Sequence, residues 1–162
     1  EIAHQWFYAS VGNREYQEGW LDEGFATLLE RDIYGLADCE AHNLVKTFEP
    51  SYPSLKEKET IRTEIMEYSR ELYQDIHLNI PPNEYPEEQT YGTAEYEGGY
   101  AFLQELRHLL GNDTFMIFLQ DYYKEFYMKT VTTDEFLDFI KNYNNSEKLN
   151  EIIQFYFITF LK

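Results

Sequence analysis

Two residues near the start of the sequence, His4 and Glu23, have side chains that bind metal ions. The segment Glu1-Ile2-Ala3-His4 matches the last four positions of H-E-x-x-H, a helical motif whose two histidines bind one zinc ion. The glutamate of such a motif takes a proton from the attacking water as a general base. A further ligand must come from a second helix, and Glu23, with eighteen residues between it and His4, is the candidate. These residues predict hydrolytic chemistry at a metal, with Glu1 as the base.

The first histidine of the motif would stand immediately before Glu1, and the sequence does not contain it. We therefore expect the chain to begin inside the motif of a longer protein. A site that lacks a ligand binds its metal weakly. The 162-residue chain by itself is expected to bind zinc weakly or not at all and to be inactive.

Each candidate residue also has an ordinary structural interpretation. His4 on an apolar segment could be a core histidine, and Glu23 could be a carboxylate that stabilises the start of a helix. The spacing between the two residues favours metal binding. A second open hypothesis is a peptidase-like helical domain without catalysis, which serves as a scaffold or an interaction surface.

The sequence around these residues resembles the zinc aminopeptidases of the aminopeptidase N type, which are gluzincin metallopeptidases. His4-Gln5-Trp6 and the segment W-L-D-E-G-F-A at 20–26 match two blocks of that family. Tyr96-Glu97-Gly98-Gly99 resembles its Y-E-K-G block, with Gly98 in place of the usual lysine. The resemblance implies that Tyr96 stabilises the oxyanion of the tetrahedral intermediate. Tyr91 matches a second tyrosine often found five residues earlier.

The resemblance is specific at 1–30 and 91–100 and looser over the rest of the chain. It implies an all-α fold, the helical lobe of a thermolysin-like (zincin) catalytic domain, with residues 1–162 as a single helical domain. It also implies a zinc-dependent aminopeptidase that uses one zinc ion to hydrolyse peptide substrates. A β-rich lobe of the same protein, which anchors the amine of the substrate, is expected upstream.

The segments that position these residues are predicted to be helices. Apolar spacing, glycines and capping signals predict the helices 2–11, 20–34, 39–48, 54–76, 92–110, 112–128 and 146–162, with another that begins at Thr132. Thr132 and Glu135 have the spacing of a capping box. A loop is predicted at 79–91, and no stretch alternates long enough to predict a β-strand.

The composition limits the partners of the chain. A net charge of −17 argues against binding to nucleic acid and to anionic membranes. Cys39 is the only cysteine, so no internal disulfide or multi-thiolate metal site can form. No targeting or membrane-spanning segment is present within the chain, and its compartment stays open. The aromatic C-terminal segment is either core or an apolar surface for a further domain or for self-association.

Overall fold

A computed structural model describes residues 2–33, 77–85 and 88–157 of the chain. Most of these residues are helical, which confirms the predicted all-α class. Glu1 and the predicted helices 39–48 and 54–76 lie outside the described residues. Within the described part of the chain, no helix combines the length and the apolar composition needed to cross a membrane.

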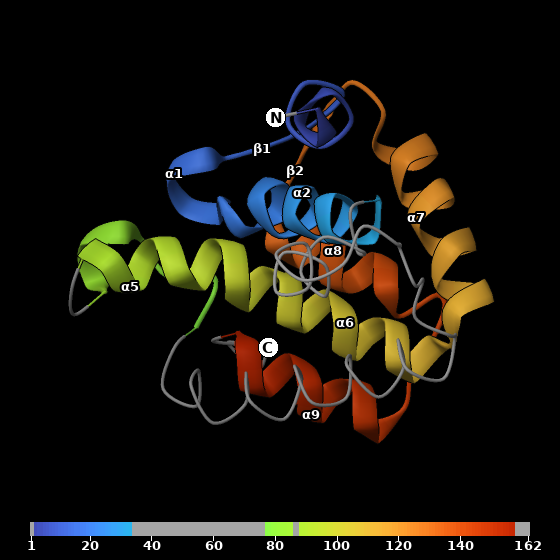
Figure 1. The fold of residues 1–162 in the computed structure, drawn as a ribbon. Coiled ribbons are helices and arrows are strands. Elements are labelled where there is room, and N and C mark those ends of the chain that lie inside the picture. The colour runs from blue at the N-terminus through green and yellow to red at the C-terminus, as the bar shows by residue number, and fades with distance from the viewer. Residues whose placement is uncertain (1, 34–76, 86–87, 158–162) are drawn as a thin grey trace, which may run out of the picture.

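The secondary structure begins with a short 3-10 turn and ends with the helix α9 (Figure 1). In chain order the elements are the 3-10 turn Ala3–Gln5, β1 (Val11–Asn13), α1 (Glu15–Glu18), α2 (Trp20–Ile33), a 3-10 turn Pro82–Glu84, α5 (Glu88–Thr93), a π-helical turn Ala94–Gly98, α6 (Gly99–Leu110), α7 (Asn112–Phe126), β2 (Lys129–Val131), α8 (Thr133–Ile140) and α9 (Glu147–Tyr156).

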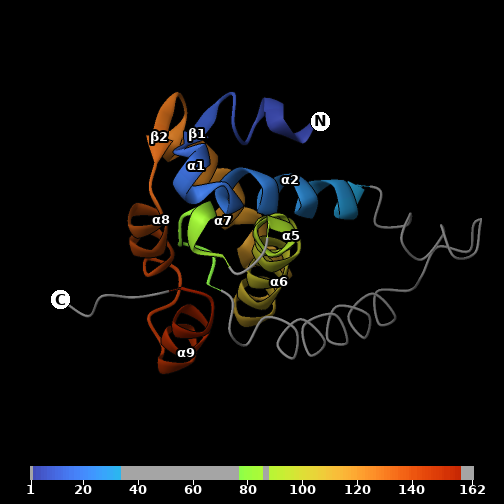
Figure 2. The same cartoon turned by 90° about the vertical axis from the view of Figure 1, so that its left-hand side faces the viewer.

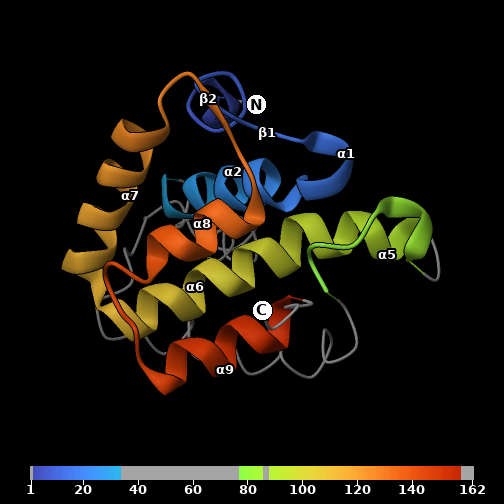
Figure 3. The same cartoon turned by 180° about the vertical axis from the view of Figure 1, so that it is seen from behind.

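Helix α6 occupies the centre of the structure. It continues α5 and the π-helical turn as one long rod, which Figure 1 and Figure 3 show from opposite sides. Helix α2 packs on one side of this rod and α9 on the other (Figure 2). Phe136 of α8 packs its ring against Trp20 of α2 and Phe102 of α6. The first turn of α2 and the π-helical turn, which carry Glu23 and Tyr96, therefore lie against each other.

The prediction of a helix over 2–11 is wrong. Only the 3-10 turn forms there, because Tyr8 adopts a positive φ of 110° that no helix can contain. The chain then enters β1, which pairs in parallel with β2 and so overturns the prediction of no strands. Phe7 and Val11 have helical spacing in the sequence, but Phe7 is buried from the turn before β1 and Val11 from β1 itself.

Two predicted boundaries also differ from the structure. The loop predicted at 79–91 ends early, because α5 already begins at Glu88. The last helix ends at Tyr156, where Phe157 turns to an extended conformation and its ring packs against Trp20 and Phe102. The capping box of Thr132 and Glu135 and the helix end at Gly111 are as predicted.

Aromatic side chains form the centre of the core. The rings of Phe102, Phe136 and Phe157 all surround Trp20 with centroids 5.0–5.5 Å away. Trp20 is fully buried, and its Nε1 donates a hydrogen bond to Thr133 Oγ1 at 3.0 Å. This residue lies three positions before Glu23, so the core fixes the start of the helix that carries the candidate ligand.

Two glycines allow α2 and α6 to approach very closely. A Cβ atom built on Gly24 would lie 2.9 Å from the Cα of Gly99, and one on Gly99 would lie 2.9 Å from the Cα of Gly24. Because both obstacles are backbone atoms, no side chain can move to make room. The Gly24–Gly99 contact sits one residue after Glu23 and three residues after Tyr96, so it sets the distance between them.

We predict that Gly24→Ala lowers the free energy of unfolding by about 1–3 kcal/mol, because the added methyl group forces the two helix backbones apart. Gly92→Ala is the matched control, since a Cβ there meets nothing within 4 Å. This control should leave stability unchanged or raise it by about 0.5–1 kcal/mol. Urea unfolding measures both effects, and equal stabilities for the two variants would contradict the prediction.

Candidate active site

The structure brings three of the four residues singled out in the sequence into direct contact. His4 Nε2 lies 3.3 Å from Glu23 Oε2. The Tyr96 hydroxyl donates a hydrogen bond of 2.7 Å to the other oxygen, Glu23 Oε1. Glu1 lies outside the described residues, so its position relative to this cluster stays a prediction.

Each residue of the cluster comes from a different element. His4 stands in the 3-10 turn, Glu23 in the first turn of α2, and Tyr96 in the middle of the π-helical turn. π-Helical turns are rare and occur frequently at functional sites. The turn Ala94–Gly98 packs on α2, and the ion pair between Arg31 and Glu97 joins the same two elements further along.

His4 and Glu23 have the geometry of two ligands of one metal ion. Nitrogen and oxygen ligands at about 2.0–2.1 Å from a tetrahedral zinc lie about 3.3 Å apart. The observed separation of His4 Nε2 and Glu23 Oε2 is 3.3 Å. Among the described residues no third His, Cys, Asp or Glu joins this pair to complete a metal site. The donor pair therefore fits zinc, and the remaining ligands would have to come from elsewhere.

A partly buried polar network surrounds the start of the helix that carries Glu23. Asn13 Nδ2 donates to Asp22 Oδ1 and to the backbone carbonyl of Glu18, both at 2.7 Å. Glu18 in turn accepts a hydrogen bond of 2.6 Å from the backbone N–H of Thr133. Burial raises the pKa values of Asp22 and Glu18. These contacts tie β1 to α1 and to the first turn of α2, and they tie α1 to the start of α8.

Sequence reasoning missed Glu95, which stands beside Tyr96. Its side chain is 8% exposed, and it forms a hydrogen bond with Tyr91. Burial raises the pKa of Glu95 to about 7, and the nearby carboxylates of Asp22 and Glu23 add to the shift. A glutamate next to the candidate tyrosine carries no spacing signal of its own, so the sequence offers no way to distinguish it from surface acids.

The cluster lies at the surface, where a substrate could reach it. Tyr96 is 45% exposed, and Trp6 and Tyr8, which flank the backbone near His4, are exposed as well. The ring of Tyr8 meets that of His4 edge-on at 6.2 Å. Exposed aromatic rings beside the His4–Glu23 pair could cover the apolar parts of a bound ligand.

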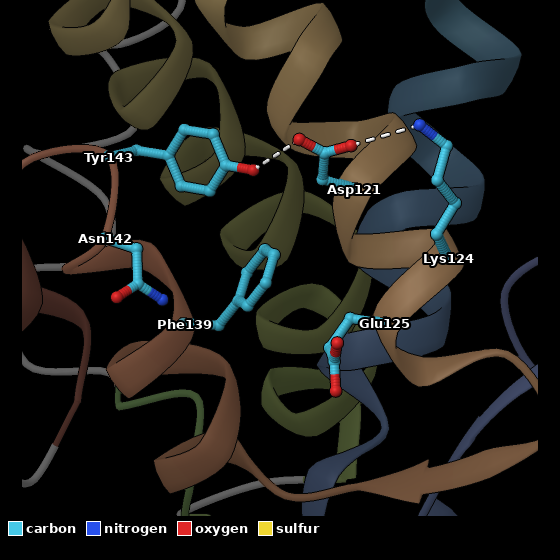
Figure 4. A pocket seen from close by; sticks show the side chains of 6 residues that line it. All are labelled: Asp121, Lys124, Glu125, Phe139, Asn142 and Tyr143. Carbon is cyan, nitrogen blue, oxygen red and sulfur yellow. Dashed lines mark hydrogen bonds and ion pairs between the residues drawn. The ribbon is translucent and has the colours of Figure 1, made fainter.

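A hollow of about 510 Å³ lies elsewhere, between α7 and the end of α8 (Figure 4). Tyr143 and Lys124 both point at Asp121 in this view, with hydrogen bonds of 2.9 and 3.1 Å. The bond from Tyr143 lowers the pKa of Asp121. None of the candidate residues lines this hollow, and the polar groups at its centre already satisfy one another.

Comparison with known proteins places the chain in a family. Residues 1–156 match the family model described as the peptidase family M1 domain. The chain belongs to the peptidase M1 family. Aminopeptidase B of Homo sapiens is 33% identical over 144 residues, which cover 88% of this chain and 21% of that protein. Leucine aminopeptidase 2 of Lodderomyces elongisporus is 27% identical over 171 residues, with 94% and 26% covered.

The M1 fold is also found by structural comparison. The crystal structure of the M1 zinc metallopeptidase from Deinococcus radiodurans matches with a TM-score of 0.66 at 24% identity. This match covers 99% of the present chain and 32% of the other one. The M1 chain described here thus spans between a fifth and a third of the length of the relatives it matches.

We predict that Glu95→Gln changes stability in a pH-dependent way. The pKa of Glu95 rises from about 4.5 in the unfolded chain to about 7 in the folded one, so the folded state keeps the proton up to a higher pH. Its contribution is fully present below pH 4.5 and is lost as the pH rises to 7. At pH 8 the variant should be more stable than the parent by on the order of 2–3 kcal/mol. At pH 4 the difference should be near zero.

Thermal unfolding at both pH values measures this effect. Glu125→Gln is a matched control, because Glu125 is exposed and stands apart from the buried acids. A Glu95→Gln variant that shows the same stability difference at pH 4 and pH 8 would contradict the prediction.

Proposed function

We propose that the protein to which this chain belongs is a zinc-dependent metallopeptidase that acts as an aminopeptidase. The observation that carries the proposal is the Glu23 carboxylate, which contacts His4 through one oxygen and Tyr96 through the other. A metal ligand and a phenolic donor are thereby held next to each other at an exposed position. Membership of the M1 family supports the same reaction class.

His4 Nε2 and Glu23 Oε2 would hold the zinc ion, together with the histidine that the H-E-x-x-H motif places before Glu1. Zinc in such a site polarises the peptide carbonyl and lowers the pKa of water. The oxygen Glu23 Oε1 is engaged by Tyr96, so Glu23 offers one oxygen to a metal. The network of Asp22 and Asn13 keeps this carboxylate in place.

Tyr96 is the group that would bind the developing negative charge on the carbonyl oxygen. Its hydrogen bond to Glu23 raises its pKa, so the phenol keeps its proton at neutral pH and can donate it in a hydrogen bond. Glu1 would take the proton from the attacking water and pass it to the leaving amine. The peptide would enter from the exposed side, past Trp6 and Tyr8.

The anchor for the amine of the substrate would come from a β-rich lobe of the same protein, upstream of the helical lobe. The coverage of the relatives, which are about three to five times longer than the present chain, supports a contribution from other parts of the protein. The names of the curated relatives, aminopeptidase B and leucine aminopeptidase 2, support a free N-terminus as the recognised group.

We predict that Tyr96→Phe in the full-length protein lowers kcat by about 10²–10³-fold, because it removes one oxyanion donor. KM and zinc content should change little, since the phenyl ring and Glu23 remain. The measurement is hydrolysis of aminoacyl chromogenic substrates, with zinc determined by mass spectrometry. Tyr127→Phe serves as the control, because that tyrosine is exposed and lies on the loop before β2.

Chelation tests the proposal as a whole. Removal of the metal should abolish hydrolysis, and Glu23→Gln should weaken zinc retention along with activity. Hydrolysis that is indifferent to a chelator would contradict the metallopeptidase function. A full-length protein that binds zinc without hydrolysing any aminoacyl substrate would favour a role as a non-catalytic scaffold.

A further inference from the structure

The side chain of Glu95 occupies space that Gly19 leaves open. A Cβ atom built on Gly19 would lie 1.9 Å from Glu95 Oε1 and 2.7 Å from its Cδ. Any larger residue at position 19 would therefore collide with this carboxyl group. Gly19 stands immediately before α2, one helical turn ahead of Glu23.

The carboxyl group of Glu95 also contacts the preceding helix, α5. It forms a hydrogen bond with Tyr91 of α5, and the ring of Tyr91 packs edge-on against Tyr85 at 5.5 Å. Glu95 Oε1, the atom over Gly19, has no hydrogen-bond partner among the described residues. An unpartnered buried oxygen lowers the free energy of unfolding. A carboxyl group kept in this position must therefore contribute something else that offsets the cost.

The π-helical turn explains how Glu95 and Tyr96 can both face α2. Successive side chains of an α-helix point about 100° apart. A π-helical turn holds more residues, and the angle between neighbours becomes smaller. Glu95 lies over Gly19, immediately before α2, and Tyr96 meets α2 about one turn later at Glu23.

We propose that Glu95 is a positioning residue, whose carboxyl group seats over Gly19, binds Tyr91 and so holds the π-helical turn that presents Tyr96 to Glu23. This inference rests on the proposed peptidase function, in which Tyr96 contacts the substrate. Burial raises the pKa of Glu95 to about 7, which allows a protonated carboxyl to fill this space near neutral pH. In this proposal Glu95 acts on the reaction only through the position of Tyr96.

The test compares substitutions of Glu95 and Gly19 in the full-length, zinc-loaded protein. Glu95→Ala should lower kcat by about 10–100-fold with KM and zinc content unchanged, because Tyr96 loses its register with Glu23. Glu95→Gln has the same shape and still accepts from Tyr91, so it should stay within about threefold of the parent. Gly19→Ala should lower kcat like Glu95→Ala. The two substitutions combined should cost less than the sum of their separate effects.

Glu105→Ala is the matched control for a buried glutamate. Glu105 is 3% exposed and accepts a hydrogen bond of 2.9 Å from Tyr156, away from Glu23. Its removal should lower the melting temperature and leave kcat unchanged. If Glu95→Ala lowers the melting temperature and leaves kcat at the parent value, Glu95 is merely structural and the proposal is overturned.

A second measurement does not depend on activity. In a crystal structure of the full-length Glu95→Ala protein, the Tyr96 hydroxyl should lie beyond hydrogen-bond distance of Glu23. In Glu95→Gln it should stay within that distance. An unchanged Tyr96–Glu23 bond in Glu95→Ala would overturn the proposal. If the parent protein shows no chelator-sensitive hydrolysis, the proposed function fails, while this structural comparison still decides whether Glu95 positions Tyr96.

Discussion

The close approach of α2 and α6 at Gly24 and Gly99 is the constraint on which the rest of the site depends. It brings two helix backbones to a separation that no side chain at either position would allow. Glu23 and Tyr96 lie within three residues of this contact on opposite helices, so their side chains meet at 2.7 Å. A wider spacing between the helices would leave the tyrosine unable to reach the carboxylate.

The contact also concentrates negative charge. Asp22, Glu23 and Glu95 lie near one another, and burial raises the pKa values of Asp22 and Glu95. Carboxyl groups in such surroundings are destabilising when they are all ionised. A divalent cation on His4 and Glu23 would offset part of this repulsion, so the local charge and the donor geometry favour the same kind of ligand. Burial of the aromatic residues around Trp20 stabilises the fold against this repulsion.

Motif spacing and the family resemblance singled out His4, Glu23 and Tyr96 from the sequence, and the structure places their side chains together. The contact between Glu95 and Gly19 could not be predicted this way. The two residues lie far apart in the sequence, and only the fold places the carboxyl group over the glycine. In the segment 2–11, the sequence pattern predicted a helix that does not form. Phe7 and Val11 have helical spacing, but burial against the core and the pairing of β1 with β2 decide its backbone. Strands of three residues are too short to produce a detectable alternation.

The two oxygens of Glu23 have different partners. Oε2 faces His4, and Oε1 accepts the hydrogen bond from Tyr96. Tyr96 must release Glu23 before its proton can point fully at another oxygen, and breaking a hydrogen bond to a charged group costs about 1.5–3 kcal/mol. A carbonyl oxygen that gains negative charge can repay this cost, whereas a neutral ground-state carbonyl repays less of it. In the proposed reaction, the resting hydrogen bond would therefore favour donation by Tyr96 in the transition state over donation to the bound substrate, which is the differential binding that catalysis requires.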